Sequence, residues 1–122
     1  MQYLIRENNS KDKDLIDNFN KELNNHGFNF NLPQYNESLS NENNFIFERR
    51  FILTENSNVI RAGYNLKYQW FKVNDEIIQL GYYYNPVTAG LFNKKYNVCG
   101  ILLLNDANKK KHDLFSLGMG GY

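Results

Sequence analysis

The strongest constraint on the fold is a strict alternation of side chains between Ile60 and Phe71. A period of two places alternate residues on opposite faces of a β-strand, and an apolar/polar alternation is typical of an antiparallel sheet with one buried face. The pattern therefore predicts a long strand with one face in the core. The apolar set is Ile60, Ala62, Tyr64, Leu66, Tyr68 and Trp70.

Weaker patterns on either side predict the remaining elements. Leu15, Phe19 and Leu23 recur every four residues, with Ile16 beside them, which indicates a helix that Ser10 caps and that ends near His26. The order β-α-β-β-β-α-β predicts an α/β fold of the α+β type with a mixed, largely antiparallel sheet. The predicted elements are a strand at 2–6, a helix at 10–26, strands at 44–54, 60–71 and 77–84, a helix at 93–111 and a strand at 114–117. The connection 28–44 is polar and leaves room for a second short helix.

Size and composition exclude several classes of protein. A chain of 122 residues is one domain, and a net charge of +1 argues against a nucleic-acid-binding surface. No apolar run approaches the ~20 residues that cross a bilayer, so no membrane association is expected. The single cysteine, Cys99, forms no internal disulfide, which favours a reducing, cytoplasmic location. No cluster of Cys and His has metal-ligand spacing, so no metal is expected.

The end of the chain suggests an incomplete sheet. The apolar run 114–117 is followed at once by the glycine-rich run 118–121, which resembles a loop cut short. We therefore expect residues 1–122 to be a single domain that is the N-terminal portion of a longer one, without its last helix and strands. The alternative is that this uncovered apolar strand edge pairs with a second copy of the chain.

The segment from residue 77 to residue 104 is the predicted functional site. It reads as a strand with Ile78, Leu80, Tyr82 and Tyr84 on its apolar face, a loop opened by Asn85-Pro86, and a helix. A loop that feeds a helix N-terminus presents unpaired N–H groups and the positive end of a helix dipole, which together bind anions. We expect the amides from Pro86 to Lys95 to face a hollow of phosphate size.

At this point the chain resembles the GNAT superfamily of acyl-CoA N-acyltransferases. The resemblance covers most of the chain as architecture, and its specific part runs from Gly81 to Gly121. Tyr84-Asn85-Pro86 is similar to the family's strand end, and Lys95-Tyr96-Asn97-Val98-Cys99-Gly100 keeps the basic first residue and the last glycine of its pyrophosphate motif. Val98 stands where the central glycine of that motif belongs.

The resemblance implies an N-acetyltransferase that moves an acetyl group from acetyl-CoA, its co-substrate, to an unknown amine. Loop amides hold the pyrophosphate, and a backbone N–H at the strand end polarises the thioester carbonyl. Glu76 as general base and Tyr83 as part of an acceptor pocket are the candidate catalytic residues. The candidate coenzyme-binding residues are Tyr84, Asn85, Pro86, Val87, Thr88, Gly90, Lys94 and Lys95.

Each of these residues also has a purely structural interpretation. Glu76 can be a turn carboxylate, Tyr83 a cross-strand packing residue, Gly90 a turn glycine, and Lys94 and Lys95 solvated lysines. Two other functions stay open for the same pattern. One is a non-catalytic interaction domain of acyltransferase shape. The other is a small-molecule sensor domain, whose sheet would be antiparallel throughout.

Overall fold

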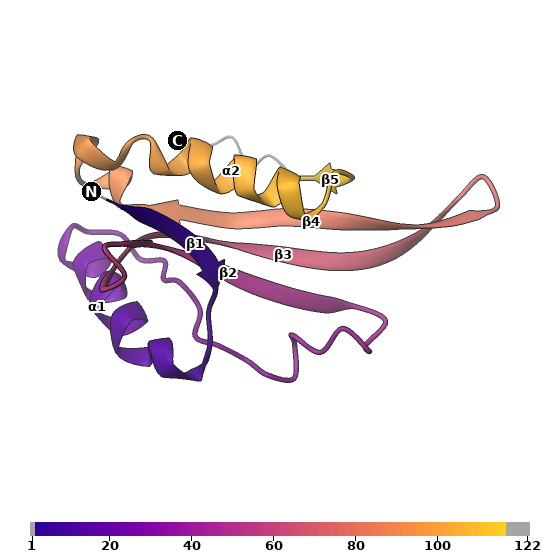
Figure 1. Ribbon diagram of the computed structural model, residues 1–122, viewed down its shortest axis with the longest axis horizontal. Helices are drawn as coiled ribbons and strands as arrows, with labels where there is room; N and C mark the ends of the chain where they lie inside the picture. Colours follow the sequence, from indigo (N-terminus) through magenta and orange to yellow (C-terminus); the bar gives the residue numbers. More distant parts are fainter. Residues whose placement is uncertain (1, 117–122) are drawn as a thin grey trace.

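The computed structural model describes residues 2–116, which form one five-stranded sheet with strands in chain order (Figure 1). The first four strands pair antiparallel, and the last pair is parallel, with Gly81 opposite Leu114. The predicted mixed, largely antiparallel sheet and the β-α-β-β-β-α-β order are therefore confirmed. The strands are β1 (Tyr3–Glu7), β2 (Phe47–Glu55), β3 (Val59–Val73), β4 (Glu76–Thr88) and β5 (Leu114–Phe115).

The alternating residues of β3 point to opposite faces of the sheet, as the sequence pattern predicted. Tyr64 and Leu66 are fully buried on one face, where Tyr64 stacks on Phe51 of β2 with ring centroids 5.0 Å apart. Gly63 points to the other face, where a Cβ would meet Leu32 at 2.8 Å. Both faces of β3 are covered at this point, so β3 lies at the centre of the hydrophobic core.

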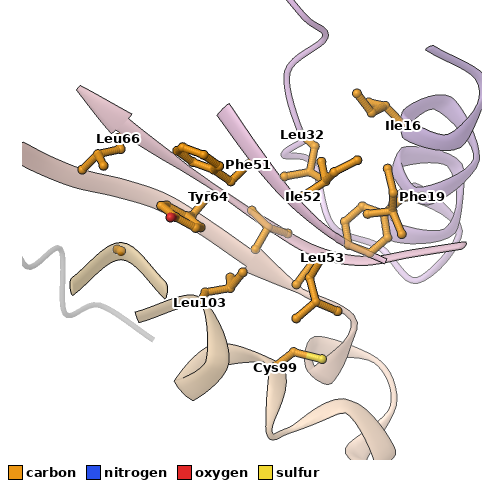
Figure 2. Packing of buried hydrophobic residues seen from close by; sticks show 14 of the residues in the cluster. Ile16, Phe19, Leu32, Phe51, Ile52, Leu53, Tyr64, Leu66, Cys99 and Leu103 are labelled. Carbon is orange, nitrogen blue, oxygen red and sulfur yellow. The ribbon is translucent and has the colours of Figure 1, made fainter. Parts of the chain in front are cut away.

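The two helices cover opposite faces of the sheet. Helix α1 (Lys13–Asn25) packs Ile16 and Phe19 on the side of Ile52, and α2 (Cys99–Lys110) packs Leu103 on the side of Leu53 (Figure 2). Three short 3-10 segments, η1 (Ser10–Asp12), η2 (Ala89–Leu91) and η3 (Lys94–Tyr96), precede these helices. The β3–β4 hairpin extends beyond the other strands (Figure 1).

The N-terminus of the first helical segment differs from the prediction. Asn9, not Ser10, is the cap, because its side chain accepts a hydrogen bond from the backbone N–H of Lys11. Asp12 completes a capping box by accepting from the N–H of Asn9 at 2.8 Å. The sequence prediction therefore placed the cap one residue too late.

Two further boundaries were wrong. Strand β4 does not end at Tyr84 but continues through Asn85-Pro86 to Thr88, and α2 begins at Cys99 instead of Asn93. Residues 28–46 form turns and no helix. Of the predicted strand at 114–117, Leu114 and Phe115 are confirmed, whereas Leu117 and the glycine-rich run lie outside the described residues.

Two predictions that concern the whole protein stay predictions. One is that the domain continues beyond residue 122, and the other is that the C-terminal strand edge pairs with a second copy. Among residues 2–116, no helix combines the length and the apolar character that crossing a membrane requires.

The capping box predicts how stability depends on pH. Arg6 donates two hydrogen bonds, of 2.8 and 2.7 Å, to the buried carboxylate of Asp12, and these hold the pKa of Asp12 below its ordinary value. A lowered folded-state pKa stabilises the protein above the unfolded-state pKa of about 4, and this stabilisation disappears as the pH falls through the folded-state value. Asp12→Asn should lower the free energy of unfolding at pH 7 by about 2–4 kcal/mol.

Urea unfolding of both proteins between pH 7 and pH 2 measures this effect. The difference between wild type and Asp12→Asn should shrink below about pH 4. Asp17→Asn is the control, because Asp17 forms an exposed ion pair with Lys13 and should cost under about 1 kcal/mol. A difference between wild type and Asp12→Asn that stays constant down to pH 2 would contradict the assignment.

Candidate functional site

A bulge near the end of β4 is the first feature of the site. Asn65 pairs with Tyr84, but Gly63 pairs with Val87, so β4 carries one extra residue between these two pairs. Asn85 adopts a left-handed backbone with φ 54°, which asparagine tolerates better than most residues. The bulge changes the direction of the β4 amides just beyond the point where β4 pairs with β5, at Gly81 and Tyr82.

The connection between β4 and α2 satisfies several of its own amides. Gly90 donates to the Thr88 hydroxyl at 3.1 Å, Lys95 donates to the Asn93 side chain at 3.0 Å, and Asn93 donates to the carbonyl of Ala89 at 2.9 Å. A Cβ at Gly90 would lie 3.0 Å from Thr88 Oγ1 and 3.2 Å from the carbonyl of Tyr96. The segment therefore fills the space beside Gly90 itself, which contradicts a phosphate-sized hollow at that glycine.

Open amides appear a few residues later, in the first turn of α2. Leu102 is the first residue of this turn whose N–H bonds to the chain, at 3.1 Å from the carbonyl of Val98. The N–H groups of Cys99, Gly100 and Ile101 find no acceptor among residues 2–116, and Val98 provides no side-chain cap. A Cβ at Gly100 would meet nothing within 4 Å. This turn therefore offers unpaired donors, a helix dipole and room for an anion.

Two lysines lie just before this turn. Lys94 and Lys95 occupy η3 and are exposed, and the Lys95 ammonium lies 5.6 Å from the centre of the Tyr96 ring. Tyr96 is buried, and Arg61 lies over its ring at 4.5 Å. The buried ring holds η3 on the sheet and so keeps both lysines near the start of α2.

Glu76 is not part of this site. It lies at the exposed turn of the β3–β4 hairpin, whereas the bulge is nine residues away along the same strand. A strand rises about 3.3 Å per residue, so the two points are ~30 Å apart. Because a general base must reach its proton within hydrogen-bond distance, directly or through one water, Glu76 cannot act at the bulge.

Tyr83 lies in the core on the α2 face. Its ring packs against Tyr64 with centroids 5.3 Å apart, and burial raises the pKa of its hydroxyl to about 12. The faces of β4 are thus the reverse of the prediction, because Gly81 and Tyr83 are buried whereas Tyr82 and Tyr84 are half-buried. The predicted role of Tyr83 in an acceptor pocket stays a prediction.

Sequence analysis missed two polar residues that matter. Asp106 of α2 accepts a hydrogen bond of 2.7 Å from Tyr64, and Asn65 lies opposite Tyr84 with only 3% of its surface exposed. Asn65 falls on the polar side of the β3 alternation, and nothing in its neighbours distinguishes it from a solvated residue. Asp106 stands four residues before Lys110, which suggests an ordinary surface pair.

One further groove lies elsewhere on the described part of the chain. A groove of about 280 Å³ runs between β1 and α2, lined by Tyr3, Leu102 and Lys109 among others, and it includes none of the predicted site residues. Within residues 2–116, no three His, Cys, Asp or Glu side chains lie close enough together to hold a metal ion.

The parallel pairing of β4 and β5 bears on the alternative functions. A sensor domain of the type considered above has an antiparallel sheet throughout, whereas an acyltransferase requires these two strands to be parallel. Gly81 and Tyr82 pair in parallel with Leu114 and Phe115. Because the sensor interpretation requires every strand pair to be antiparallel, this parallel pair excludes it.

Comparison with known proteins finds relatives in structure only. No protein-family model matches the chain, and no curated protein matches it in sequence. A GNAT family acetyltransferase from Staphylococcus aureus superposes with a TM-score of 0.66 at 15% identity, over 99% of this chain and 89% of that one.

Two further solved structures resemble the chain. An aminoglycoside acetyltransferase from an uncultured soil metagenomic sample, in complex with sisomicin, has a TM-score of 0.60 at 18% identity and covers 97% and 78% of the two chains. A predicted acetyltransferase from Clostridium acetobutylicum, solved with acetyl-CoA, has a TM-score of 0.53 at 20% identity and covers 96% and 81%. With its parallel β4–β5 pair and its bulged β4, the chain has the fold of the GNAT acetyltransferases.

Proposed function

We propose that the protein is an N-acetyltransferase that transfers the acetyl group of acetyl-CoA to an amine. The observation that supports this most is the open first turn of α2, which directly follows the strand and connection that carry the bulge. The N–H groups of Cys99, Gly100 and Ile101 have no acceptor among residues 2–116, and a Cβ at Gly100 would meet nothing within 4 Å. The coenzyme pyrophosphate is an anion that such a turn binds well. Lys94 and Lys95 add positive charge beside it.

The bulge has a separate role in this proposal. The backbone N–H of Asn85 donates to the thioester oxygen as negative charge develops there, which lowers the barrier as an oxyanion hole does. Pro86 lacks an N–H and keeps the strand on its path to Thr88. Val87 is buried and holds this end of β4 on the core.

The reaction balances without a metal ion or an intermediate covalently bound to the protein. The amine nitrogen attacks the thioester carbon, a C–N bond forms, and the C–S bond then breaks. The amine loses a proton to water or a carboxylate, and the departing thiolate gains one. A non-catalytic acyltransferase-like domain is the remaining alternative, and turnover of acetyl-CoA with an amine distinguishes the two.

Binding of acetyl-CoA should stabilise the folded chain. A ligand at about 100 times its Kd contributes about 2.7 kcal/mol, which for a domain of this size is a rise in Tm of roughly 5–10 °C. Gly100→Glu should raise the Kd about tenfold or more, because it puts a carboxylate beside the proposed pyrophosphate site. The free variant should be no less stable than wild type, because an acid in the first turn suits the helix dipole.

Asn108→Glu is the matched control, since it adds the same charge to an exposed position in the last turn of α2. Its Kd for acetyl-CoA, measured by calorimetry, should stay within about twofold of wild type. The proposal fails if acetyl-CoA leaves the Tm of wild type unchanged. The site assignment fails if both glutamate variants bind it equally.

The two glycines separate the observed site from the expected one. Gly100→Ala should raise the free energy of unfolding by up to about 1 kcal/mol, because the added methyl meets no atom and alanine favours helix. Gly90→Ala should lower it by about 1–3 kcal/mol, because its Cβ would press on Thr88 and on the Tyr96 carbonyl. Urea unfolding of the free proteins measures both. Equal effects of the two changes would contradict the described packing.

A further inference from the structure

A row of stacked aromatic rings lies on the face of the sheet opposite α2. Tyr82 stacks on Tyr84 with centroids 4.8 Å apart and planes 19° apart, and on Phe115 at 4.9 Å and 8°. Phe71 meets the Phe115 ring edge-on at 5.8 Å, which closes that end of the row. Three nearly parallel rings therefore form one stack that crosses β4 and β5.

The other end of the stack is open and lies at the bulge. No further aromatic ring of residues 2–116 packs on Tyr84, which is half-buried and directly precedes Asn85. A flat ring placed there would continue the stack, and offset stacking contributes beyond simple burial. The open end is thus next to the amide that the proposed function assigns to the thioester.

A side-chain amide lies beside this end. Asn65 faces Tyr84 across the β3–β4 ladder, and only 3% of its surface is exposed. Within residues 2–116, the fully buried side-chain atoms without a hydrogen-bond partner are the Tyr3 hydroxyl oxygen and Arg49 Nε, so the Asn65 carboxamide is not one of them. A carboxamide at this position has the donors and the acceptor to bind a polar group of a ligand.

The charge on this face is positive. Lys67 lies between Tyr82 of β4 and Glu48 of β2 and forms no ion pair among the described residues, whereas Glu48 is paired with Arg50 at 2.9 Å. A free ammonium group next to an aromatic stack favours a ligand that carries both a flat ring and an anion. The same charge disfavours a polycation.

We propose that the amine acceptor carries a flat aromatic ring and a carboxylate, as an aromatic amino acid does. This inference rests on the proposed function, because it assigns the acceptor of the same reaction. The ring stacks on Tyr84, the carboxylate pairs with Lys67, and the Asn65 carboxamide binds the polar group between them. The amino group is then presented at the bulge, where the C–N bond forms and the C–S bond breaks.

The first test compares four amines with wild-type protein and acetyl-CoA. L-phenylalanine has both groups, 2-phenylethylamine only the ring, L-leucine only the carboxylate, and spermidine neither. The kcat/KM for L-phenylalanine should exceed each of the others by about tenfold or more. Equal use of L-leucine, or a preference for spermidine, would overturn the inference.

Variants then assign the two preferences to residues. Tyr84→Leu should reduce the ratio of kcat/KM for L-phenylalanine to that for L-leucine by about tenfold, because leucine is apolar but cannot stack. Lys67→Gln should reduce the ratio of L-phenylalanine to 2-phenylethylamine by a similar factor. Trp70→Leu and Lys72→Gln, exposed residues near the hairpin turn, are the matched controls and should leave both ratios unchanged. Unchanged ratios in Tyr84→Leu or Lys67→Gln count against the inference.

A binding measurement separates this inference from the proposed function. In a ¹⁵N NMR titration of wild type with L-phenylalanine, the side-chain amide signals of Asn65 should shift, and L-leucine should shift them at least about tenfold less at equal concentration. If acetyl-CoA raises the Tm but these signals do not move, the acceptor assignment is wrong and the transferase proposal stands. If acetyl-CoA does not bind, the transferase proposal itself fails.

Discussion

The hydrogen bond between Tyr64 and Asp106 holds the proposed site in place. Tyr64 is fully buried on β3, and its hydroxyl donates to a carboxylate on α2 at 2.7 Å. Burial and the neighbouring carboxylate both raise the pKa of Tyr64, so it stays protonated and keeps donating. Because buried donors are seldom left unpaired, this bond fixes the position of α2 along the sheet. The open first turn of α2 is therefore carried by a rigid element.

The bulge at Asn85 explains why sequence analysis ended β4 too early. Asn-Pro ordinarily marks a turn, and proline removes one donor from a strand ladder. The extra residue in β4 places Pro86 between two ladder pairs, where its missing N–H costs nothing in the pairing of β3 with β4. Patterning predicted that a strand and a helix flank this segment. It could not predict the left-handed residue that lets the strand continue.

Periodicity recovered the elements that bury a face and missed features that depend on single contacts. The alternation in β3 and the stripe on α1 correspond to buried side chains, as residues 62, 64, 66 and 16, 19, 23 show. The faces of β4 were reversed, because three consecutive tyrosines satisfy either choice and only contact with α2 decides between them. Gly100 predicted the open first turn of α2 only weakly, because a glycine within a helix has many explanations. The buried position of Asn65 gave no signal at all.

Asparagine side chains help decide where the open amides lie. Asn9, Asn36, Asn41 and Asn93 each accept a hydrogen bond from the backbone N–H two residues ahead. Such turns satisfy local donors and leave nothing for a ligand to bind. Asn93 does this within the segment expected to hold phosphate. Val98 has no side-chain acceptor, so the first turn of α2 keeps its donors free. Asn93 thus pairs a backbone N–H within the connection, whereas Val98 leaves the N–H groups in the first turn of α2 without a side-chain acceptor.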